Sequence, residues 1–253
     1  MTNPEKEKSP EKIDIAQIDR VMEALPEVQA GKDFWQNDFH EFDVYEHTAK
    51  FVKHMKEILD DEDNEIDPHL VVAGWLHDIG KPVVATPKMK DGVQAEREPG
   101  KLYHGFTNHE IEGEEMVRRM DPQIFEALGL DQEKIASLVY CHYLPMKGIK
   151  ETRKTANWDD FLQQYEGLKK VLIDIETTEE RTPVSKREVL LMFLADKLAQ
   201  GDPDKYVTDQ GELFAIRDAL LSEDSEQEQQ RLKDIYELQK REAEAGKQYA
   251  KKE

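Results

Sequence analysis

The chain contains 253 residues, in which 55 acidic side chains outnumber 35 basic ones and give a formal net charge of −20 at pH 7. This charge argues against binding along an extended nucleic acid, because such binding depends on clustered lysine and arginine. No apolar run approaches the roughly 18 residues of a membrane-spanning helix, which argues against a membrane protein. The single cysteine, Cys141, excludes an internal disulfide and a cysteine-rich zinc site.

The chain divides by composition into three parts. Residues 1–11 are charged and contain proline, and we expect a disordered lead-in there. They lack the apolar stretch of a secretory signal, so we expect a cytoplasmic protein. Over residues 12–222 we expect a single helical domain, because apolar residues recur with helical spacing almost throughout. Residues 223–253 form a tail dense in Glu, Lys and Gln, which favours a solvated helix or disorder.

The first two apolar stripes have the period of an amphipathic helix. One covers residues 15–25 and stops at Pro26, and the other covers residues 44–59. His47 lies one turn before Phe51 on the apolar face of the second stripe. We therefore expect its imidazole to point into the core.

The third predicted helix is apolar on nearly all sides. Asp67 and Pro68 are typical of an N-cap and a first-turn proline, and the segment LVVAGWLHDIG follows them up to Gly80. We expect this helix to be central and buried, with His77 and Asp78 at its end. Burying a carboxylate beside an imidazole is unfavourable unless a partner or a cation compensates for it. Neutral imidazole and carboxylate are suitable ligands for zinc, manganese or iron.

The connection over residues 82–107 is long and contains several glycines and prolines, and such loops are often functional. Within it, VVATP and KLYHGF predict at most one small β-hairpin. Helical spacing returns at about 108–120, 132–143, 158–180, 185–200 and 210–222.

Three candidate ligands stand in these later segments. His109 begins NHEIEGEEMV, His142 ends IASLVYCH, and Asp196 takes the place of an aliphatic residue after VLLMFLA. An inward aspartate needs a partner, and a metal ion would be one. His109 and His142 could instead be hydrogen-bonded core histidines. His104 competes with His109, and we expect it to be a loop residue near the mouth of the site. The remaining histidines are expected at the surface or at helix caps: His40, His54 and His69.

His47, the pair His77-Asp78 and Asp196 resemble the H…HD…D pattern of the HD-domain metal-dependent phosphohydrolases. The flanking segments agree with that pattern over about residues 40–205: FDVYEHTAKFV, WLHDIGKP, FTNHEIEGEEM, CHYLP and FLADKLAQGD. The HDIGKP…NHE run is most similar to the HD domain attached to bacterial tRNA nucleotidyltransferases. The chain has no counterpart of the nucleotidyltransferase portion, so that activity is not carried over.

The resemblance implies an all-α HD-domain helical bundle with a central metal site. It implies one divalent ion held by four residues: His47, His77, Asp78 and Asp196. Asp78 would bridge to a second ion completed by His109 and His142, and manganese, iron, nickel, cobalt and zinc all suit such ligands. Two ions held in this way can lower the pKa of a shared water and stabilise charge on a phosphoryl oxygen. Lys81 matches the HDxxK form of the motif and would bind the substrate phosphate or the departing oxygen.

The activity implied is hydrolysis of a phosphomonoester or a cyclic phosphodiester in a small substrate, such as a nucleotide. One alternative is a di-iron oxygenase of the same fold, since its ligands would be the same. The other is a non-catalytic HD regulatory or binding module. Further phosphate contacts are expected among four cations, between which the sequence does not choose: Arg118, Arg119, Lys147 and Lys150.

Overall fold

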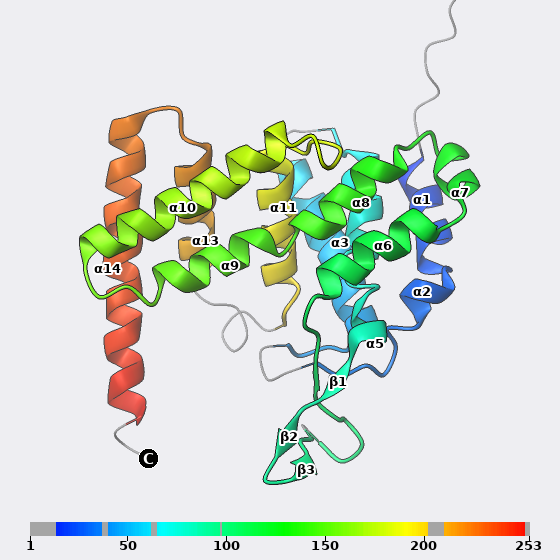
Figure 1. The fold of residues 1–253 in the computed structure, drawn as a ribbon, viewed down its shortest axis with the longest axis horizontal. Helices are drawn as coiled ribbons and strands as arrows, with labels where there is room; N and C mark the ends of the chain where they lie inside the picture. Colours follow the sequence, from blue (N-terminus) through cyan, green and yellow to red (C-terminus); the bar gives the residue numbers. More distant parts are fainter. Residues whose placement is uncertain (1–13, 37–39, 62–64, 97, 202–209, 251–253) are drawn as a thin grey trace, which may run out of the picture.

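A computed structural model of the protein describes residues 14–36, 40–61, 65–96, 98–201 and 210–250 (Figure 1). The predicted lead-in lies outside these residues. As predicted, the fold is all-α. The helices before the long connection are α1 (Ile15–Glu23), α2 (Pro26–Gln29), α3 (Val44–Asp61), α4 (Pro68–Leu76) and α5 (Lys81–Val84). Those after it are α6 (His109–Arg119), α7 (Pro122–Glu126), α8 (Gln132–Cys141), α9 (Leu144–Thr152), α10 (Trp158–Thr177), α11 (Lys186–Leu198), α13 (Gln210–Leu221) and α14 (Ser225–Ala250).

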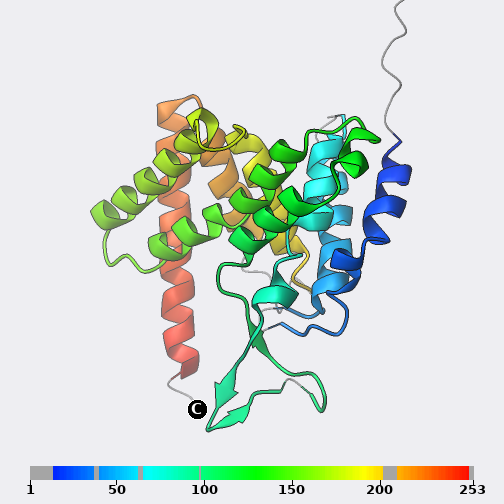
Figure 2. The ribbon, with the colours of Figure 1, turned by 45° about the vertical axis from the view of Figure 1, so that its right-hand side comes forward.

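Among the described residues, the β-strands all lie in the long connection over residues 82–107. β1 (Thr86–Pro87) pairs antiparallel with β4 (His104–Gly105), which joins the two segments predicted to form a hairpin. A second antiparallel pair, β2 (Met89–Lys90) with β3 (Val93–Gln94), lies between them. Figure 2 shows this connection extending away from the helices. In the described part of the chain no helix is both long enough and apolar enough to cross a bilayer.

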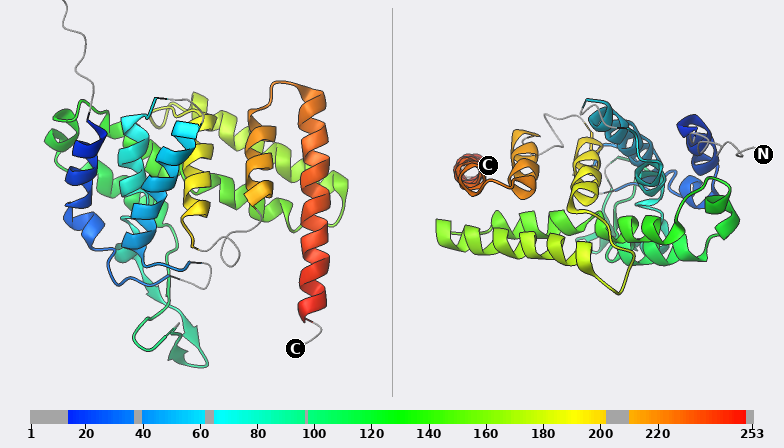
Figure 3. Two further views of the ribbon diagram at one scale, coloured as in Figure 1. Left: turned by 180° about the vertical axis from the view of Figure 1, so that it is seen from behind. Right: turned by 90° about the horizontal axis from the view of Figure 1, so that it is seen from above.

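α4 lies at the centre of the helical packing, as its sequence predicts. Asp67 is its N-cap and accepts a hydrogen bond from the backbone nitrogen of His69 at 2.8 Å, and Pro68 is its first residue. The helix packs against α1, α3 and α8, and α11 packs against α3. Seen from above in Figure 3, the green helices from α6 to α10 run along one side, and the remaining long helices stand across them. This packing directs the ends of α4 and α8 toward one region between the layers.

Gly80 allows the turn after α4 to touch the start of α6. A Cβ atom at this position would overlap the carbonyl oxygen of His109 and lie 2.7 Å from the backbone nitrogen of Gly113. Both atoms belong to the backbone and cannot rotate away as a side chain could. The close approach requires glycine, and it brings Asp78 beside His109.

The C-terminal segment differs from the solvated helix that its composition favours. α14 packs against α13, and its residues Leu232, Ile235 and Tyr236 are buried. Ile235 and Tyr236 follow Leu232 by three and four positions, which places both on the same face of the helix as Leu232. Whether residue 222 is a domain boundary stays a prediction.

Candidate metal centre

The structure brings together all six residues that the sequence proposes as ligands. His47 lies on α3, His77 and Asp78 in the turn after α4, and His109 at the first position of α6. His142 is the C-cap of α8, and Asp196 lies in the last turns of α11. All six side chains are buried, although they come from segments up to 149 residues apart.

Asp78 lies between two halves of this cluster. Its Oδ2 is 3.1 Å from Nε2 of His77 and 3.6 Å from Nε2 of His47, which in turn is 3.1 Å from Oδ1 of Asp196. We call His47, His77 and Asp196 the Asp196 half. The other oxygen of Asp78, Oδ1, is 3.4 Å from Nε2 of His109 and 4.0 Å from Nε2 of His142. We call these two histidines the His142 half.

The four imidazoles of the cluster share one orientation, in which Nδ1 faces a backbone carbonyl. The pairs are His47 with Ala199 at 3.1 Å, His77 with Gly74 at 2.8 Å, His109 with Phe106 at 2.8 Å and His142 with Val139 at 2.6 Å. A carbonyl oxygen only accepts hydrogen bonds, so Nδ1 carries the proton in each ring. In a neutral imidazole this leaves the lone pair on Nε2, which is the atom that points to Asp78 or Asp196.

Asp78 Oδ1 is a buried carboxylate oxygen for which the described residues supply no hydrogen-bond donor. It faces the Nε2 lone pairs of His109 and His142, which repel it. A buried charge in this position is strongly unfavourable unless a cation compensates for it. The donor set and this oxygen therefore fit a divalent metal ion. Three groups of potential ligands lie close enough to hold one: His40 with His47 and Asp196, His47 with His77 and Asp78, and Asp78 with His109 and His142.

The two carboxylates are charged at neutral pH. Burial by itself would raise the pKa of Asp78, but the neighbouring His77 and Lys81 outweigh it and hold the pKa well below the usual value. Burial acts on Asp196 in the same direction, and there the charge of Lys197 dominates the opposing effects, so its pKa is also well below the usual value. Both groups are thus in the form that binds metal.

His47, His109 and His142 are held in the neutral form that metal binding requires. Burial lowers the pKa of His47, partly opposed by the neighbouring Asp196 carboxylate. Burial also lowers the pKa of His109, and it lowers the pKa of His142 to about 3, assisted by the neighbouring His77 and His109. Ions therefore need not displace protons from these Nε2 atoms at neutral pH.

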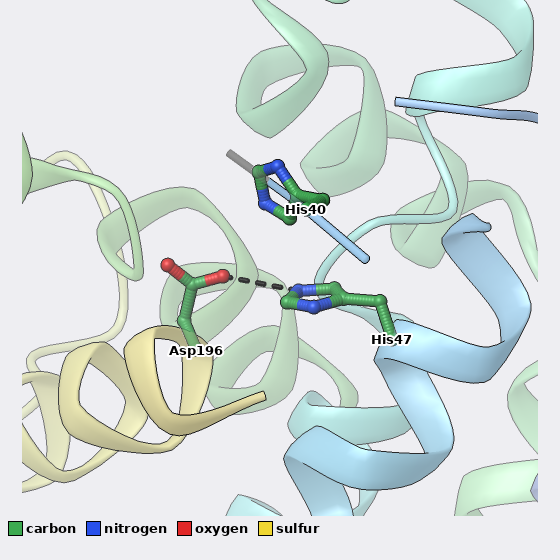
Figure 4. Close-up of side chains that lie close together, drawn as sticks. All are labelled: His40, His47 and Asp196. Atoms are coloured by element: carbon green, nitrogen blue, oxygen red, sulfur yellow. Dashed lines mark hydrogen bonds and ion pairs between the residues drawn. The ribbon is translucent and has the colours of Figure 1, made fainter. Parts of the chain in front are cut away.

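Sequence reasoning missed His40, which it assigned to the surface or to a cap. The structure places this ring on the wall of the site, beside His47 and Asp196 (Figure 4). The backbone nitrogen of Glu41 donates to the carbonyl of Gln200 at 2.7 Å, and this bond brings the segment against the end of α11. Burial lowers the pKa of His40 well below its ordinary value, and the charge of Lys81 adds to the effect. No pattern around His40 in the sequence indicates a contact with a residue so far along the chain.

A cavity of about 610 Å³ opens over the cluster. Among the described residues its lining includes six cations: Lys81, Lys88, Lys147, Lys150, Arg153 and Lys197. The acidic residues in the same described lining are Asp78, Glu110 and Asp196. The cavity is thus rich in positive charge, although the whole chain carries −20.

The four cations predicted as phosphate contacts differ in whether they line the cavity. Lys147 and Lys150 lie in its lining, and Lys147 forms an ion pair with Glu110 at 2.7 Å. Arg118 and Arg119 are not among the described lining residues; they pair with acidic residues on the outer surface of α6 and α8, Glu133 and Glu112 among them.

Lys81 lies at the floor of the cavity. Its Nζ donates to Oδ2 of Asp78 at 2.6 Å and to the side-chain oxygen of Gln36 at 2.7 Å. His104 was predicted to be a loop residue and instead lies in β4; it lines the cavity and belongs to no metal-ligating group found among the described residues. His54 and His69 lie elsewhere and contact Glu57 and Asp67.

A family model described as HD domain matches residues 44–201 of the chain. The match spans all six predicted ligands and Lys81, and it begins after His40. No curated protein and no solved structure matched the chain in the corresponding comparisons.

Proposed function

Because the chain belongs to the HD-domain family, a family of metal-dependent phosphohydrolases, we propose that it hydrolyses a small phosphorylated substrate at a two-metal site. The bond broken is a phosphomonoester or a cyclic phosphodiester, and the substrate is a nucleotide. The observation that carries this proposal is the position of Asp78. Each of its oxygens faces a different set of imidazole Nε2 atoms at the floor of a cation-lined cavity.

Each half of the cluster would hold one ion, with Asp78 shared between them. One ion would bind the Asp196 half through His47, His77, Asp78 and Asp196, and the other would bind Asp78, His109 and His142. When bound, the ions supply a water of lowered pKa and neutralise charge that develops on a phosphoryl oxygen. The carbonyl partners of the four Nδ1 atoms hold the rings in place, so their orientation is set before substrate enters.

The charge of the cavity supports a phosphorylated substrate. A phosphate group is attracted by lysine and arginine side chains, and their effect is strong where the walls exclude water. Lys81, which pairs with Asp78 at the floor, is placed to bind a phosphate oxygen close to the cluster. Lys150 lies farther out, where its Nζ donates to the hydroxyl of Tyr143 at 2.8 Å.

Tyr143 supports a nucleotide in particular. Its ring centroid lies 5.6 Å from that of His109 and 6.2 Å from that of His142, so it borders the His142 half. An aromatic face in this position can stack against a nucleobase whose phosphate lies at the cluster. The finer resemblance to the HD domain of tRNA nucleotidyltransferases stays a prediction.

The decisive experiment combines the metal content of the purified protein with hydrolysis assays on nucleoside monophosphates, cyclic nucleotides and bis(p-nitrophenyl) phosphate. We expect about two equivalents of transition metal, loss of hydrolysis on chelation and its recovery on reloading. Two irons with oxygen consumption and no hydrolysis would instead support the oxygenase. A protein that binds no metal under any loading condition would contradict both enzyme assignments.

The contribution of the cavity charge is tested separately with Lys150→Ala, for which Lys53→Ala on the exposed surface of α3 is the matched control. We expect the first variant to raise KM for a phosphorylated substrate and the second to leave it unchanged. Equal KM values in the two variants would contradict a role for this part of the wall.

A further inference from the structure

His40 does not belong to the ligand pattern of the family to which the chain belongs. The family match begins at residue 44, and the H…HD…D pattern starts at His47. The structure nevertheless groups His40 with two residues of that pattern. One potential ligand atom from each of His40, His47 and Asp196 lies within 4.8 Å of the other two.

Figure 4 shows how the three side chains lie. The His40 ring stands above the space between His47 and Asp196, with one of its nitrogen atoms on the side of the Asp196 carboxylate. The rings of His40 and His47 meet nearly edge-on, with centroids 5.2 Å apart and planes inclined by 83°. The imidazoles therefore do not stack on each other, and a ligand atom of each lies close to the Asp196 carboxylate.

The same short segment after α11 positions both histidines. The carbonyl of Ala199 accepts a hydrogen bond from Nδ1 of His47, and the next carbonyl, of Gln200, accepts one from the backbone nitrogen of Glu41. The side-chain amide of Gln200 lies 3.5 Å from Nε2 of His40. Because Asp196 is one turn earlier on this helix, a single element fixes the spacing of all three potential ligands.

We propose that His40 is an additional ligand of the metal ion bound in the Asp196 half, an inference that rests on the proposed two-metal site. With His40 this half offers imidazole from three residues and carboxylate from two. A nitrogen-rich set of this kind favours borderline transition metals such as iron, cobalt, nickel and zinc over magnesium. The two halves then differ in their ligand sets and should bind their ions with different strengths.

The test is titration of the metal-free protein with Co²⁺, followed by its visible absorption and by calorimetry. His40→Gln keeps a polar amide in place but removes the imidazole, and His104→Gln is the matched control because His104 lines the same cavity outside the ligand groups found in the described chain. We expect His40→Gln to weaken one of the two binding events by about tenfold or more and to change its absorption bands. His104→Gln should bind and absorb as the wild type does.

Two further variants separate this inference from the proposed function. In His40→Asp a carboxylate replaces the imidazole, and we expect it to restore part of the lost affinity with an absorption spectrum of its own. Wild-type affinity and spectrum in His40→Gln, while Asp78→Ala has lost its metal, would overturn the role of His40 and leave the two-metal site standing. A wild-type protein that binds no cobalt would overturn both.

Discussion

The two halves of the cluster differ in how their charges are balanced. In the Asp196 half the protein supplies its own counter-charges. Asp196 contacts Lys197 through Oδ2, and Asp78 contacts Lys81 through Oδ2. In the His142 half, Asp78 Oδ1 has no donor among the described residues, and it faces the lone pairs of two neutral imidazoles.

This contrast shows which half depends more on a bound ion. Lysine can balance a carboxylate in the absence of metal, so the Asp196 half is close to charge-balanced on its own. In the His142 half, the carboxylate oxygen without a donor and the two imidazole lone pairs face one another, and a divalent cation would bind all three. We therefore expect the two halves to respond differently to substitution, to packing changes and to pH.

The largest effect is expected from Asp78→Ala, because this substitution removes the group that the two halves share. Both ions should be lost, and hydrolysis should fall to background with them, since the remaining imidazoles of each half lack their common carboxylate. Metal analysis and hydrolysis rates on the same preparation measure this. Full activity in a metal-free Asp78→Ala protein would contradict the proposed function.

His142→Gln should impair metal binding in one half and leave the other half intact. We expect it to retain one ion of two and to weaken the lost site by about 10- to 100-fold or more, because glutamine cannot replace the imidazole as a ligand. Asp196→Asn is the corresponding substitution in the Asp196 half, and it should weaken binding of the ion there. Calorimetric titration of both variants with Co²⁺ measures the two sites. The simultaneous loss of both ions in each variant would mean that the halves are not independent.

Much of this arrangement could be predicted from the sequence. His47 and Asp196 interrupt apolar helix faces, and His77-Asp78 ends a helix that is apolar on nearly all sides, so helical periodicity alone directs them inward. The start of α4 follows from Asp67 and Pro68, whose N-cap chemistry is local. Local patterns are enough where a residue's position depends on its own helix.

The remainder depends on contacts between distant segments. His40 reaches the site through a backbone hydrogen bond from Glu41 to Gln200, which no local pattern encodes. α9 was missed because Pro145 follows CHYL and is typical of a helix end, whereas it lies in the first turn of a new helix. The positive charge of the cavity could not be predicted either, because the net charge of the whole chain does not show where its basic residues come together in space.

Gly80→Ala should act on one half through packing. The added Cβ would overlap backbone of α6, so the turn after α4 and the helix that begins with His109 must move apart. We expect a loss of about 3 kcal/mol in the free energy of unfolding, and a larger loss of affinity for the ion in the His142 half than for the other ion. Urea unfolding and Co²⁺ titration measure these effects.

Gly167→Ala is the matched control for this substitution. Gly167 lies in α10, and nothing lies within 4 Å of the Cβ that alanine would add. This control should be neutral or more stable by about 0.5–1 kcal/mol, because alanine favours a helix. If Gly80→Ala were as stable as Gly167→Ala, the close approach of the turn and α6 would not be needed for the fold.

The smallest effect is the pH dependence of the metal-free protein. His142 has a pKa of about 3 in the folded protein, against about 6.5 in the unfolded chain, so the unfolded state binds more protons between these values. Its contribution to stability is therefore fully present above about pH 6.5 and is lost progressively as the pH falls toward 3. At pH 5 the stability lost in this way is roughly 2 kcal/mol.

The carboxylates allow this effect to be assigned to the histidines. The pKa values of Asp78 and Asp196 are lowered on folding, so their stabilising contribution is lost only below about pH 4, where the unfolded chain begins to protonate. Thermal unfolding of the chelated protein at pH 7.5 and pH 5 should therefore show a loss of stability that is smaller by roughly 2 kcal/mol in His142→Gln than in the wild type. An equal loss in both proteins would mean that His142 is not held neutral. In that case an imidazolium could itself balance Asp78 Oδ1, and the contrast between the two halves would disappear.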